Sequence, residues 1–365
     1  MGVKGVLMIA GGGTGGHIYP AIAIAREYLS RDPERRAVFV GTERGLEKTI
    51  VPKAGFPLEF IDVGGLKGKG GLDLIRNVLR VPKGLIQAFR LVGRHQPSVV
   101  LGVGGYSSGP VLLAAKLRGV PTIIHEANAF PGLANRAVAR FVTAVAVAFA
   151  DALPRLKRPD GVVTGNPIRK EFFEAQKPGQ RATGDGQRLL IFGGSQGSRI
   201  LNDTMTGALL FLARLKDSLE IVHQTGPNEL EKVQKAYRES AFAHATVVPY
   251  LDPIVDQMAA ADLVVSRAGA MTIGELSAIG RAAILVPFAA ATNNHQELNA
   301  RVVERAGGAV VITEAELSPE KLAAAITDIA GDPQRAERMG AASKTLALPS
   351  ATKNIVDLIE KIQTK

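Results

Sequence analysis

The chain has 365 residues, of which 46% are hydrophobic and none is cysteine, and it contains 40 glycines and 20 prolines. This length exceeds one usual core, so two α/β domains are expected, and the absence of thiols excludes disulfides and thiolate metal sites. The net charge of +10 suits an anionic partner, but 5% aromatic residues without tryptophan do not indicate nucleic-acid binding.

A glycine-rich loop follows the first predicted strand. Residues 5–10 are apolar, residues 11–16 read GGGTGG, and His17 precedes a predicted helix. The Gly-x-Gly-x-x-Gly spacing matches the dinucleotide fingerprint, so a nicotinamide-dependent oxidoreductase is one hypothesis, although strand 37–40 lacks the terminal acid that would hold a ribose. The other hypothesis is a loop that binds a pyrophosphate or a sugar. His17 would then act as a general base or, alternatively, only bond the local backbone.

Residues 64–97 are both basic and apolar. Their seven lysines and arginines stand against a single acid, Asp73. A basic apolar helix beside a glycine loop is typical of docking on an anionic bilayer; the alternative is a helix that buries its apolar stripe against the sheet. The longest apolar run, residues 141–150, is shorter than the roughly 20 residues that cross a bilayer. The chain is therefore expected to be soluble or peripheral.

Two further strands of the N-terminal half end in polar residues. Strand 98–103 leads into Gly104-Gly105-Tyr106-Ser107, and strand 122–124 leads into His125-Glu126-Ala127-Asn128. In open α/β sheets, ligands bind at the carboxyl ends of the strands. One polar site is therefore predicted to gather His17, Tyr106, Ser107, His125, Glu126 and Asn128.

The C-terminal half repeats this layout. After a polar connector at 174–187, the predicted strand 188–192 leads into a glycine turn at 193–198 and a helix at 200–215. Ser195 in this turn suits a hydrogen bond to a diphosphate. A strand, glycine loop and helix at the head of each half predict two similar domains that face each other across a cleft.

Residues 262–300 are predicted to hold a nucleotide sugar. They alternate strand, turn and helix twice, and the small-residue turn at 267–270 opens a helix whose first N–H groups favour an anion. Glu275 can accept hydrogen bonds from two ribose hydroxyls, and Gln296 can meet a sugar. The sequence has no Asp-x-Asp motif and no ligand cluster, so no metal or other cofactor is expected, and helix N–H groups would stabilise the leaving diphosphate.

Together these motifs resemble the MurG family of peptidoglycan glycosyltransferases. They occur in the family's order: GGTGGH at 12–17, GGY-x-SGP at 104–110, HE-x-N at 125–128, GNPIR at 165–169, SRAGA-x-T-x-x-E at 266–275 and N-x-x-Q-x-x-N-A at 293–300. The family usually has Gln where this chain has Ala127. The resemblance implies a GT-B fold of two Rossmann-like, doubly wound parallel-sheet domains. Residues 1–165 with a returning helix at 350–365 would bind the acceptor and the membrane, and 166–349 would bind UDP-GlcNAc.

The resemblance also implies the reaction. The expected enzyme is an inverting transferase that moves GlcNAc from UDP-GlcNAc to the 4-hydroxyl of undecaprenyl-pyrophosphoryl-MurNAc-pentapeptide (lipid I). It would be peripheral, on the anionic cytoplasmic face of the inner membrane. His17 is the predicted base and Glu126 the second candidate. The implied donor-binding residues are Thr14, Gly15, Gly16, Asn128, Arg169, Ser195, Leu251, Ala270, Met271, Thr272, Glu275 and Gln296, and the acceptor-binding residues are Gly13, Tyr106, Ser107, His125 and Asn128.

Several alternatives stay open on the sequence alone. Arg169 can reach a phosphate or form a hinge salt bridge. A related GT-B enzyme that glycosylates diacylglycerol would share most of these motifs. A non-catalytic module that binds a nucleotide sugar or a lipid would need the basic helix and Glu275, but not the polar acceptor cluster.

Overall fold

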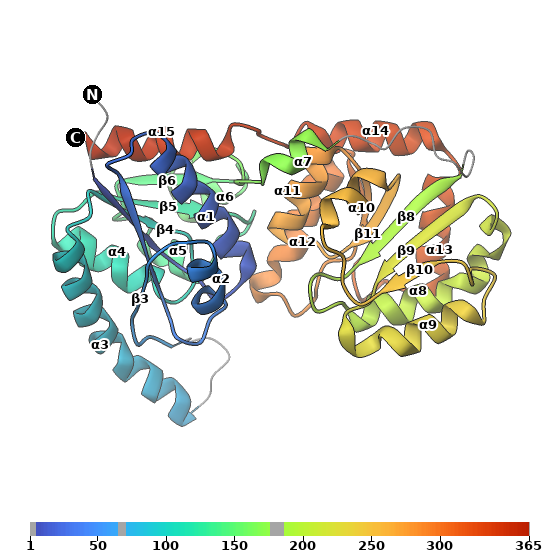
Figure 1. Cartoon of the computed structure of the whole chain (residues 1–365), viewed down its shortest axis with the longest axis horizontal. Helices are drawn as coiled ribbons and strands as arrows, with labels where there is room; N and C mark the ends of the chain where they lie inside the picture. The colour runs from blue at the N-terminus through green and yellow to red at the C-terminus, as the bar shows by residue number, and fades with distance from the viewer. Residues whose placement is uncertain (1–4, 65–70, 176–185, 365) are drawn as a thin grey trace. The chain divides into compact units, whose positions relative to one another are not determined.

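The chain folds into two compact α/β units, each built on a parallel sheet (Figure 1). The computed structural model describes residues 5–64, 71–175 and 186–364, with the backbone alone for 71–81. The first unit runs to Ile168 and takes up the chain again from Leu348, and the second unit spans Arg169–Ala347. The predicted doubly wound architecture is thus present in both.

The sheet of the first unit has the strand order β3-β2-β1-β4-β5-β6-β7. Its strands are β1 Val6–Ala10, β2 Arg36–Gly41, β3 Leu58–Phe60, β4 Val99–Gly102, β5 Thr122–Glu126, β6 Ala144–Val147 and β7 Val162–Val163. Its helices are α1 Gly15–Ser30, α2 Glu47–Lys53, α3 Gly71–His95, α4 Ser108–Leu117, α5 Leu133–Val138, α6 Ala152–Leu156 and α15 Ala351–Gln363.

Helices cover both faces of this sheet. Leu7 and Ile9 of β1 pack with α1 and α15 on one face, and Met8 packs with α3 and α4 on the other. Side chains of a strand alternate between faces, so strands buried on both sides read as continuous apolar runs. The last helix of the chain, α15, therefore completes the core of the first unit.

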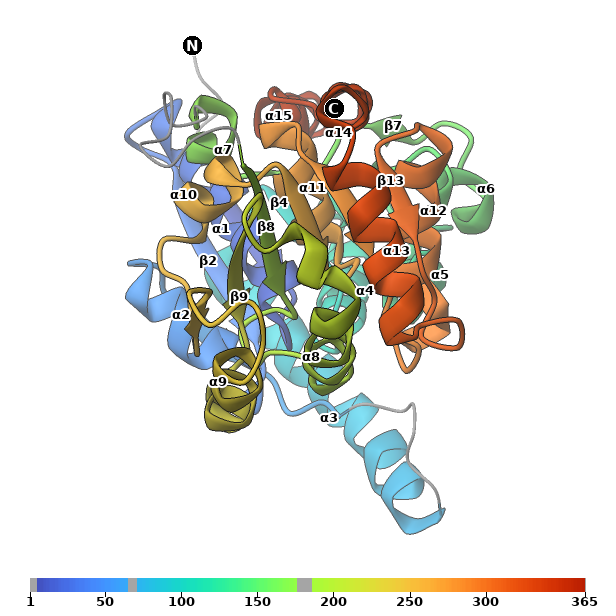
Figure 2. The ribbon, with the colours of Figure 1, turned by 90° about the vertical axis from the view of Figure 1, so that its right-hand side faces the viewer.

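The sheet of the second unit has the order β10-β9-β8-β11-β12-β13. Its strands are β8 Gln187–Phe192, β9 Leu219–Gln224, β10 Thr246–Val248, β11 Leu263–Ser266, β12 Ala282–Leu285 and β13 Ala309–Val311. Its α-helices are α7 Lys170–Glu174, α8 Arg199–Leu212, α9 Leu230–Arg238, α10 Ile254–Ala260, α11 Ala270–Ile279, α12 His295–Arg305, α13 Pro319–Ala330 and α14 Pro333–Lys344, and 3₁₀ turns lie at Ala213–Leu215, Pro227–Glu229 and Thr292–Asn294. Helices α8 and α13 lie side by side over one face of the sheet (Figure 2).

Each sheet reverses its winding between two central strands, β1 and β4 in the first unit and β8 and β11 in the second. The connections from such neighbouring strands diverge, and ligands of open α/β sheets bind there. His17 follows β1 and Tyr106 follows β4, while Ser195 follows β8 and Ala270 follows β11. The topology thus brings these four predicted residues to the switch points of their units.

Candidate active site

His17 lies at the start of α1 and is held by the glycine loop. Its Nδ1 lies 3.1 Å from the carbonyl oxygen of Gly12. Because a carbonyl only accepts, the neutral ring carries its proton on Nδ1 and leaves Nε2 as a proton acceptor. Among the described residues no group forms a hydrogen bond with Nε2. This nitrogen lies beside the loop after β4, because a Cβ atom placed on Gly104 would be 3.2 Å from it. His17 therefore bonds the local backbone through Nδ1, and its other ring nitrogen still has the geometry of a base.

Glu47, which the sequence analysis did not single out, lies under the same loop. Its side chain is 2% exposed, and its Oε2 accepts the N–H of Gly13 at 2.7 Å. That N–H is therefore engaged by a protein carboxylate, which disfavours the dinucleotide interpretation, where loop N–H groups face a pyrophosphate. The available signal was the pair of glycines around it, Gly41 and Gly45, whose missing side chains leave the space for Glu47.

Glu126 is fully occupied by its own loop. Its two oxygens accept hydrogen bonds at 2.9–3.1 Å from the backbone and side chain of Asn128, the N–H of Gly132 and the side chain of Asn135. A carboxylate offers about four acceptor positions. Glu126 therefore holds the loop 127–135 in place with all four acceptor positions in use, and its role as the second candidate base stays a prediction that this geometry disfavours.

Two predicted acceptor-binding side chains are buried. Ser107 is 1% exposed and donates to the carbonyl of Val40 at 3.1 Å. His125 is also 1% exposed; its Nε2 donates to the carbonyl of Gly165 at 3.1 Å, and burial lowers the pKa of His125. Both side chains support the loops instead of presenting themselves to a ligand. Tyr106, by contrast, is 58% exposed, and the turn that holds Gly13, Thr14, Gly15 and Gly16 is accessible.

In the second unit, Glu275 points from α11 toward Arg169. Its Oε1 lies 3.6 Å from a guanidinium nitrogen of Arg169, which also pairs with Glu171 at 2.8 Å. Burial raises the pKa of Glu275 to about 7, and the charge of Arg169 opposes this rise. Arg169 therefore forms the predicted kind of salt bridge, and one of its two acidic partners is the carboxylate predicted to hold a ribose.

Ser195 is exposed on the turn after β8, and that turn is fixed from two sides. The carbonyl of Gly194 accepts from the side chain of Gln224 at 2.8 Å. Gly197 packs so closely on the next turn that a Cβ there would lie 1.9 Å from the carbonyl oxygen of Thr225. The Ser195 hydroxyl is thus presented on a rigid turn.

A buried network of polar side chains holds the neighbouring turn at Thr225, against which Gly197 packs. Asn202 donates to the carbonyl of Thr225 at 2.9 Å and accepts from Nε2 of His223 at 3.1 Å. The other ring nitrogen of His223 then accepts from the hydroxyl of Tyr237 at 3.1 Å. Burial lowers the pKa of His223 to about 3, so the ring stays neutral and satisfies both partners.

Gln296 ties the turn before α11 to the loop after β12. Its Oε1 accepts from the N–H groups of Ala268 at 3.3 Å and Phe288 at 3.0 Å. Its Nε2 then remains as a donor for a sugar oxygen. The same turn is anchored by an ion pair that the sequence analysis missed, between Arg267 and Glu314 at 2.6 Å.

The predicted diphosphate residues form the first turn of α11. The N–H of Ile273 donates to the carbonyl of Gly269 at 2.9 Å. Ala270, Met271 and Thr272 therefore precede the first intrahelical bond, where helix N–H groups face outward and the helix dipole favours negative charge. Leu251 is partly exposed after β10.

Comparisons with known proteins find matches along both units. Residues 7–147 match the glycosyltransferase family 28 N-terminal domain, and residues 188–355 match its C-terminal domain. Two relatives named UDP-N-acetylglucosamine--N-acetylmuramyl-(pentapeptide) pyrophosphoryl-undecaprenol N-acetylglucosamine transferase are 45% identical (Myxococcus xanthus, 96% of this chain and 91% of the relative) and 42% identical (Syntrophotalea carbinolica, 98% of each). The crystal structure of Acinetobacter baumannii MurG has a TM-score of 0.83 at 31% identity, covering 98% of this chain and 100% of that one. The chain belongs to the MurG family.

Membership of the MurG family confirms the predicted GT-B glycosyltransferase. The fold is shared more widely: the structure of a UDP-GlcNAc 2-epimerase from Neisseria meningitidis has a TM-score of 0.66 at 15% identity, covering 98% of this chain and 99% of that one. Among the described side chains, no group of three or more His, Asp or Glu is placed to hold a metal ion. In the part of the chain that the structure describes, no helix is both long and apolar enough to span a bilayer.

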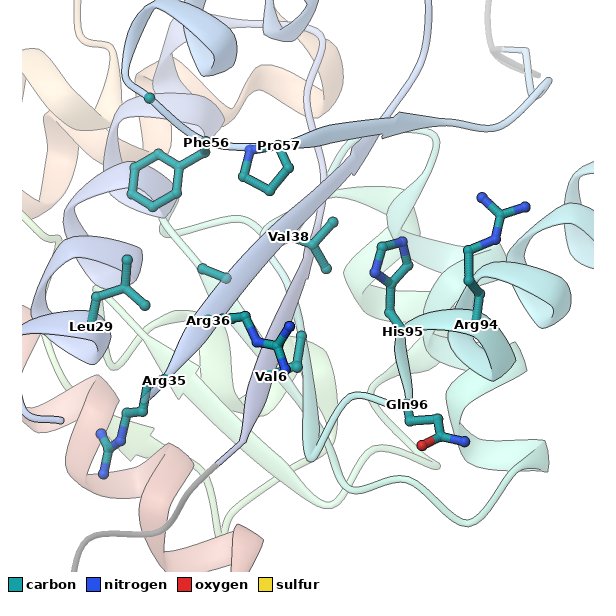
Figure 3. Close-up of a pocket in the computed structure, with 12 residues that line it drawn as sticks. Val6, Leu29, Arg35, Arg36, Val38, Phe56, Pro57, Arg94, His95 and Gln96 are labelled. Atoms are coloured by element: carbon teal, nitrogen blue, oxygen red, sulfur yellow. The ribbon is translucent and has the colours of Figure 1, made fainter. Parts of the chain in front are cut away.

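A cavity of about 670 Å³ in this MurG family member lies away from these loops, at the amino ends of β1 and β2 (Figure 3). Two of its lining side chains already have acidic partners: Arg35 pairs with Glu360 at 2.8 Å, and His95 Nε2 lies 2.8 Å from Glu59. Because His17 follows the carboxyl end of β1, the cavity lies at the opposite edge of the sheet and is not the candidate active site. Its lining includes Val6, Leu29, Arg36, Val38, Phe56 and Pro57.

Proposed function

We propose that this protein transfers N-acetylglucosamine from UDP-GlcNAc to the muramoyl 4-hydroxyl of undecaprenyl-pyrophosphoryl-MurNAc-pentapeptide. Relatives 42–47% identical over nearly the whole chain carry the name of that transferase. The observation within the chain that carries the chemistry is His17 at the switch point of the first unit, whose Nδ1 is held by the carbonyl of Gly12 while Nε2 has no hydrogen-bond partner among the described residues.

The proposed reaction is a single displacement with inversion. The acceptor 4-hydroxyl attacks the anomeric carbon of GlcNAc as the bond from that carbon to the phosphate oxygen breaks. UDP leaves with the bonding electron pair, and Nε2 of His17 takes the hydroxyl proton. Negative charge that develops on the diphosphate is stabilised by the first turn of α11 and by the hydroxyl of Ser195.

The donor would be held mainly by the second unit. Glu275 accepts hydrogen bonds from the ribose, the Nε2 of Gln296 donates to GlcNAc, and the backbone at Leu251 meets the uracil edge. Arg169 is released from Glu275 to a phosphate or stays paired when the ribose binds. The first unit, predicted as residues 1–165 with 350–365, supplies the acceptor side with Gly13, Tyr106 and the loop that carries Asn128.

We further propose that the first unit contacts the anionic cytoplasmic face of the inner membrane as a peripheral protein. The described part of α3 exposes Ile86 (54%) and Phe89 (39%), and the adjoining α4 exposes Leu117 (64%). Basic residues on the same two helices suit lipid phosphates: Lys83, Arg90, Arg94 and Lys116. The other predicted contacts, Lys67, Lys69, Arg76 and Arg80, lie outside the described side chains.

The test is UDP release from UDP-GlcNAc with and without a short-chain lipid I analogue. Release that depends on this acceptor, with a β-1,4-linked disaccharide product, is the expected outcome. Turnover with diacylglycerol instead would favour the related GT-B enzyme. Tight UDP binding without turnover on either acceptor would favour the non-catalytic module.

A further inference from the structure

One peptide group connects Glu47 to His17. The N–H of the Gly12–Gly13 peptide donates to Oε2 of Glu47 at 2.7 Å, and the carbonyl of the same peptide accepts from Nδ1 of His17 at 3.1 Å. The bond is trans, so its N–H and C=O point in opposite directions within one rigid plane. The carboxylate and the imidazole therefore hold the two ends of a single planar group.

The fold reserves a space for this carboxylate. Ideal Cβ atoms on Gly12 and Gly41 would lie 2.3 Å from Cδ and 2.5 Å from Cγ of Glu47, and one on Gly45 would lie 1.9 Å from Oε2. The other oxygen, Oε1, accepts from the backbone N–H and the hydroxyl of Thr42 at 2.9 and 3.0 Å. Within the described residues no cation pairs with Glu47, so these three donors alone fix a side chain that is 2% exposed.

We infer that Glu47 is a positioning residue that orients His17 through the Gly12–Gly13 peptide. By holding the N–H of this peptide, Glu47 fixes the direction of its carbonyl and polarises it as an acceptor. The carbonyl then keeps the proton of His17 on Nδ1 and Nε2 open toward the acceptor hydroxyl. This is the task of the third group that orients a base in many catalytic sites. The inference deepens the proposed function and rests on its assignment of His17 as the base.

The direct test is the tautomer of His17, measured by ¹⁵N NMR on the full-length protein without substrate and assigned with His17→Gln. The wild type is expected to hold the Nδ1–H form. Glu47→Gln places an amide where two N–H donors converge, so the share of the Nε2–H form is expected to rise. Glu43→Gln is the matched control, since Glu43 is exposed in the same β2–α2 connection, and its spectrum is expected to match the wild type.

Kinetics give the second readout. Glu47→Gln is expected to lower kcat on the order of 10- to 100-fold, the effect of a misplaced catalytic group, with KM for UDP-GlcNAc within about two-fold of the wild type. In a His17→Ala background, the same change is expected to cost no further activity, because Glu47 acts through His17.

An unchanged tautomer in Glu47→Gln, or an equal loss of kcat with and without His17, would overturn the inference. If Glu47→Gln does not fold, Glu47→Asp replaces it; this variant keeps the charge but falls one methylene short of Gly13, and the same tautomer change and kcat loss are expected. The NMR result needs no turnover. A wild-type protein that fails to transfer GlcNAc would therefore overturn the proposed function separately from the positioning of His17.

Discussion

The side chain of Glu275 is 16% exposed, and its charge depends on pH near neutrality. Burial raises its pKa to about 7, although Arg169 lies 3.6 Å away. The ionised form accepts hydrogen bonds from ribose hydroxyls better than the protonated form does. Ribose binding therefore favours loss of the proton, and raising the pH through about 7 populates the binding form.

Uridine affinity is accordingly expected to rise between about pH 6 and pH 8 and then to level off. Uridine is the suitable probe in calorimetry because it has no phosphate to titrate in this range. Glu275→Gln is expected to weaken binding and to remove the pH dependence. Glu171→Gln removes the exposed acid that also pairs with Arg169 and is expected to keep a rising profile; a flat wild-type profile would contradict the role of Glu275.

The same carboxyl group has the opposite effect on stability. Its folded pKa lies above its unfolded value, so between about pH 4.5 and pH 7 the folded state binds more protons than the unfolded state, and stability falls as pH rises. Glu275→Gln removes this cost. The difference in free energy of unfolding, variant minus wild type, is expected to be roughly 1–3 kcal/mol larger at pH 8 than at pH 5 in urea titrations, so the variant gains stability relative to the wild type as the pH rises. Equal differences at both pH values would contradict this account.

The loop between β4 and α4 shows how an element presents a residue. Gly104 has φ +95° and leaves room for His17 Nε2 3.2 Å from its Cβ position. Gly104→Ala is expected to lower the free energy of unfolding by about 1–2 kcal/mol, because alanine avoids this backbone conformation. It is also expected to reduce kcat, because the added methyl group would displace His17. Gly109→Ala, in the first turn of α4 with nothing within 4 Å of its Cβ position, is the control and is expected to leave both unchanged.

The exposed faces of α3 and α4 make a separate prediction about the membrane. Ile86→Glu places a negative charge on the proposed contact surface and is expected to reduce co-sedimentation with vesicles that contain anionic lipid, about 10-fold. Leu210→Glu on α8 of the second unit changes an apolar residue that is even more exposed (78%) and is expected to bind like the wild type. Equal losses in both variants would mean that the face of α3 and α4 is not the contact.

At the scale of the whole molecule, the end of the chain completes the unit in which the chain begins. Ile355 and Ile359 of α15 are 0% exposed within the core of the first unit, and Glu360 pairs with Arg31 and Arg35 of the α1 region. The second unit is formed by one continuous segment. Substitutions in α15 should therefore act on the first unit alone.

Ile359→Ala is expected to cost about 2–5 kcal/mol in the unfolding transition of the first unit, because it leaves a cavity in a packed core. Uridine is proposed to bind the folded second unit, so it should raise the temperature of the other transition. Differential scanning calorimetry with and without uridine checks both effects. A single transition that shifts with both the mutation and the ligand would mean that the two units unfold together.

Much of the secondary structure of this protein can be predicted from local sequence patterns. The strands, the glycine turns at their ends and the helix after β11 follow from apolar runs and small residues close together in the chain, and their order sufficed to identify the family. His17, Ser195, Glu275 and Gln296 lie, as predicted, in the turns and helices that follow β1, β8, β11 and β12, and these connections begin near one another because parallel strands end at a common edge.

Tertiary structure alone decided which polar groups are free. Gly13 and the carboxylate of Glu47 are 34 residues apart in sequence, and no local pattern reveals that they meet. In the structure, four donors of its own loop occupy the carboxylate of Glu126. His125 is buried as part of β5. A sequence shows which side chains can donate and accept protons, but hydrogen bonding and burial, which depend on distant neighbours, determine which of them remain available to a ligand.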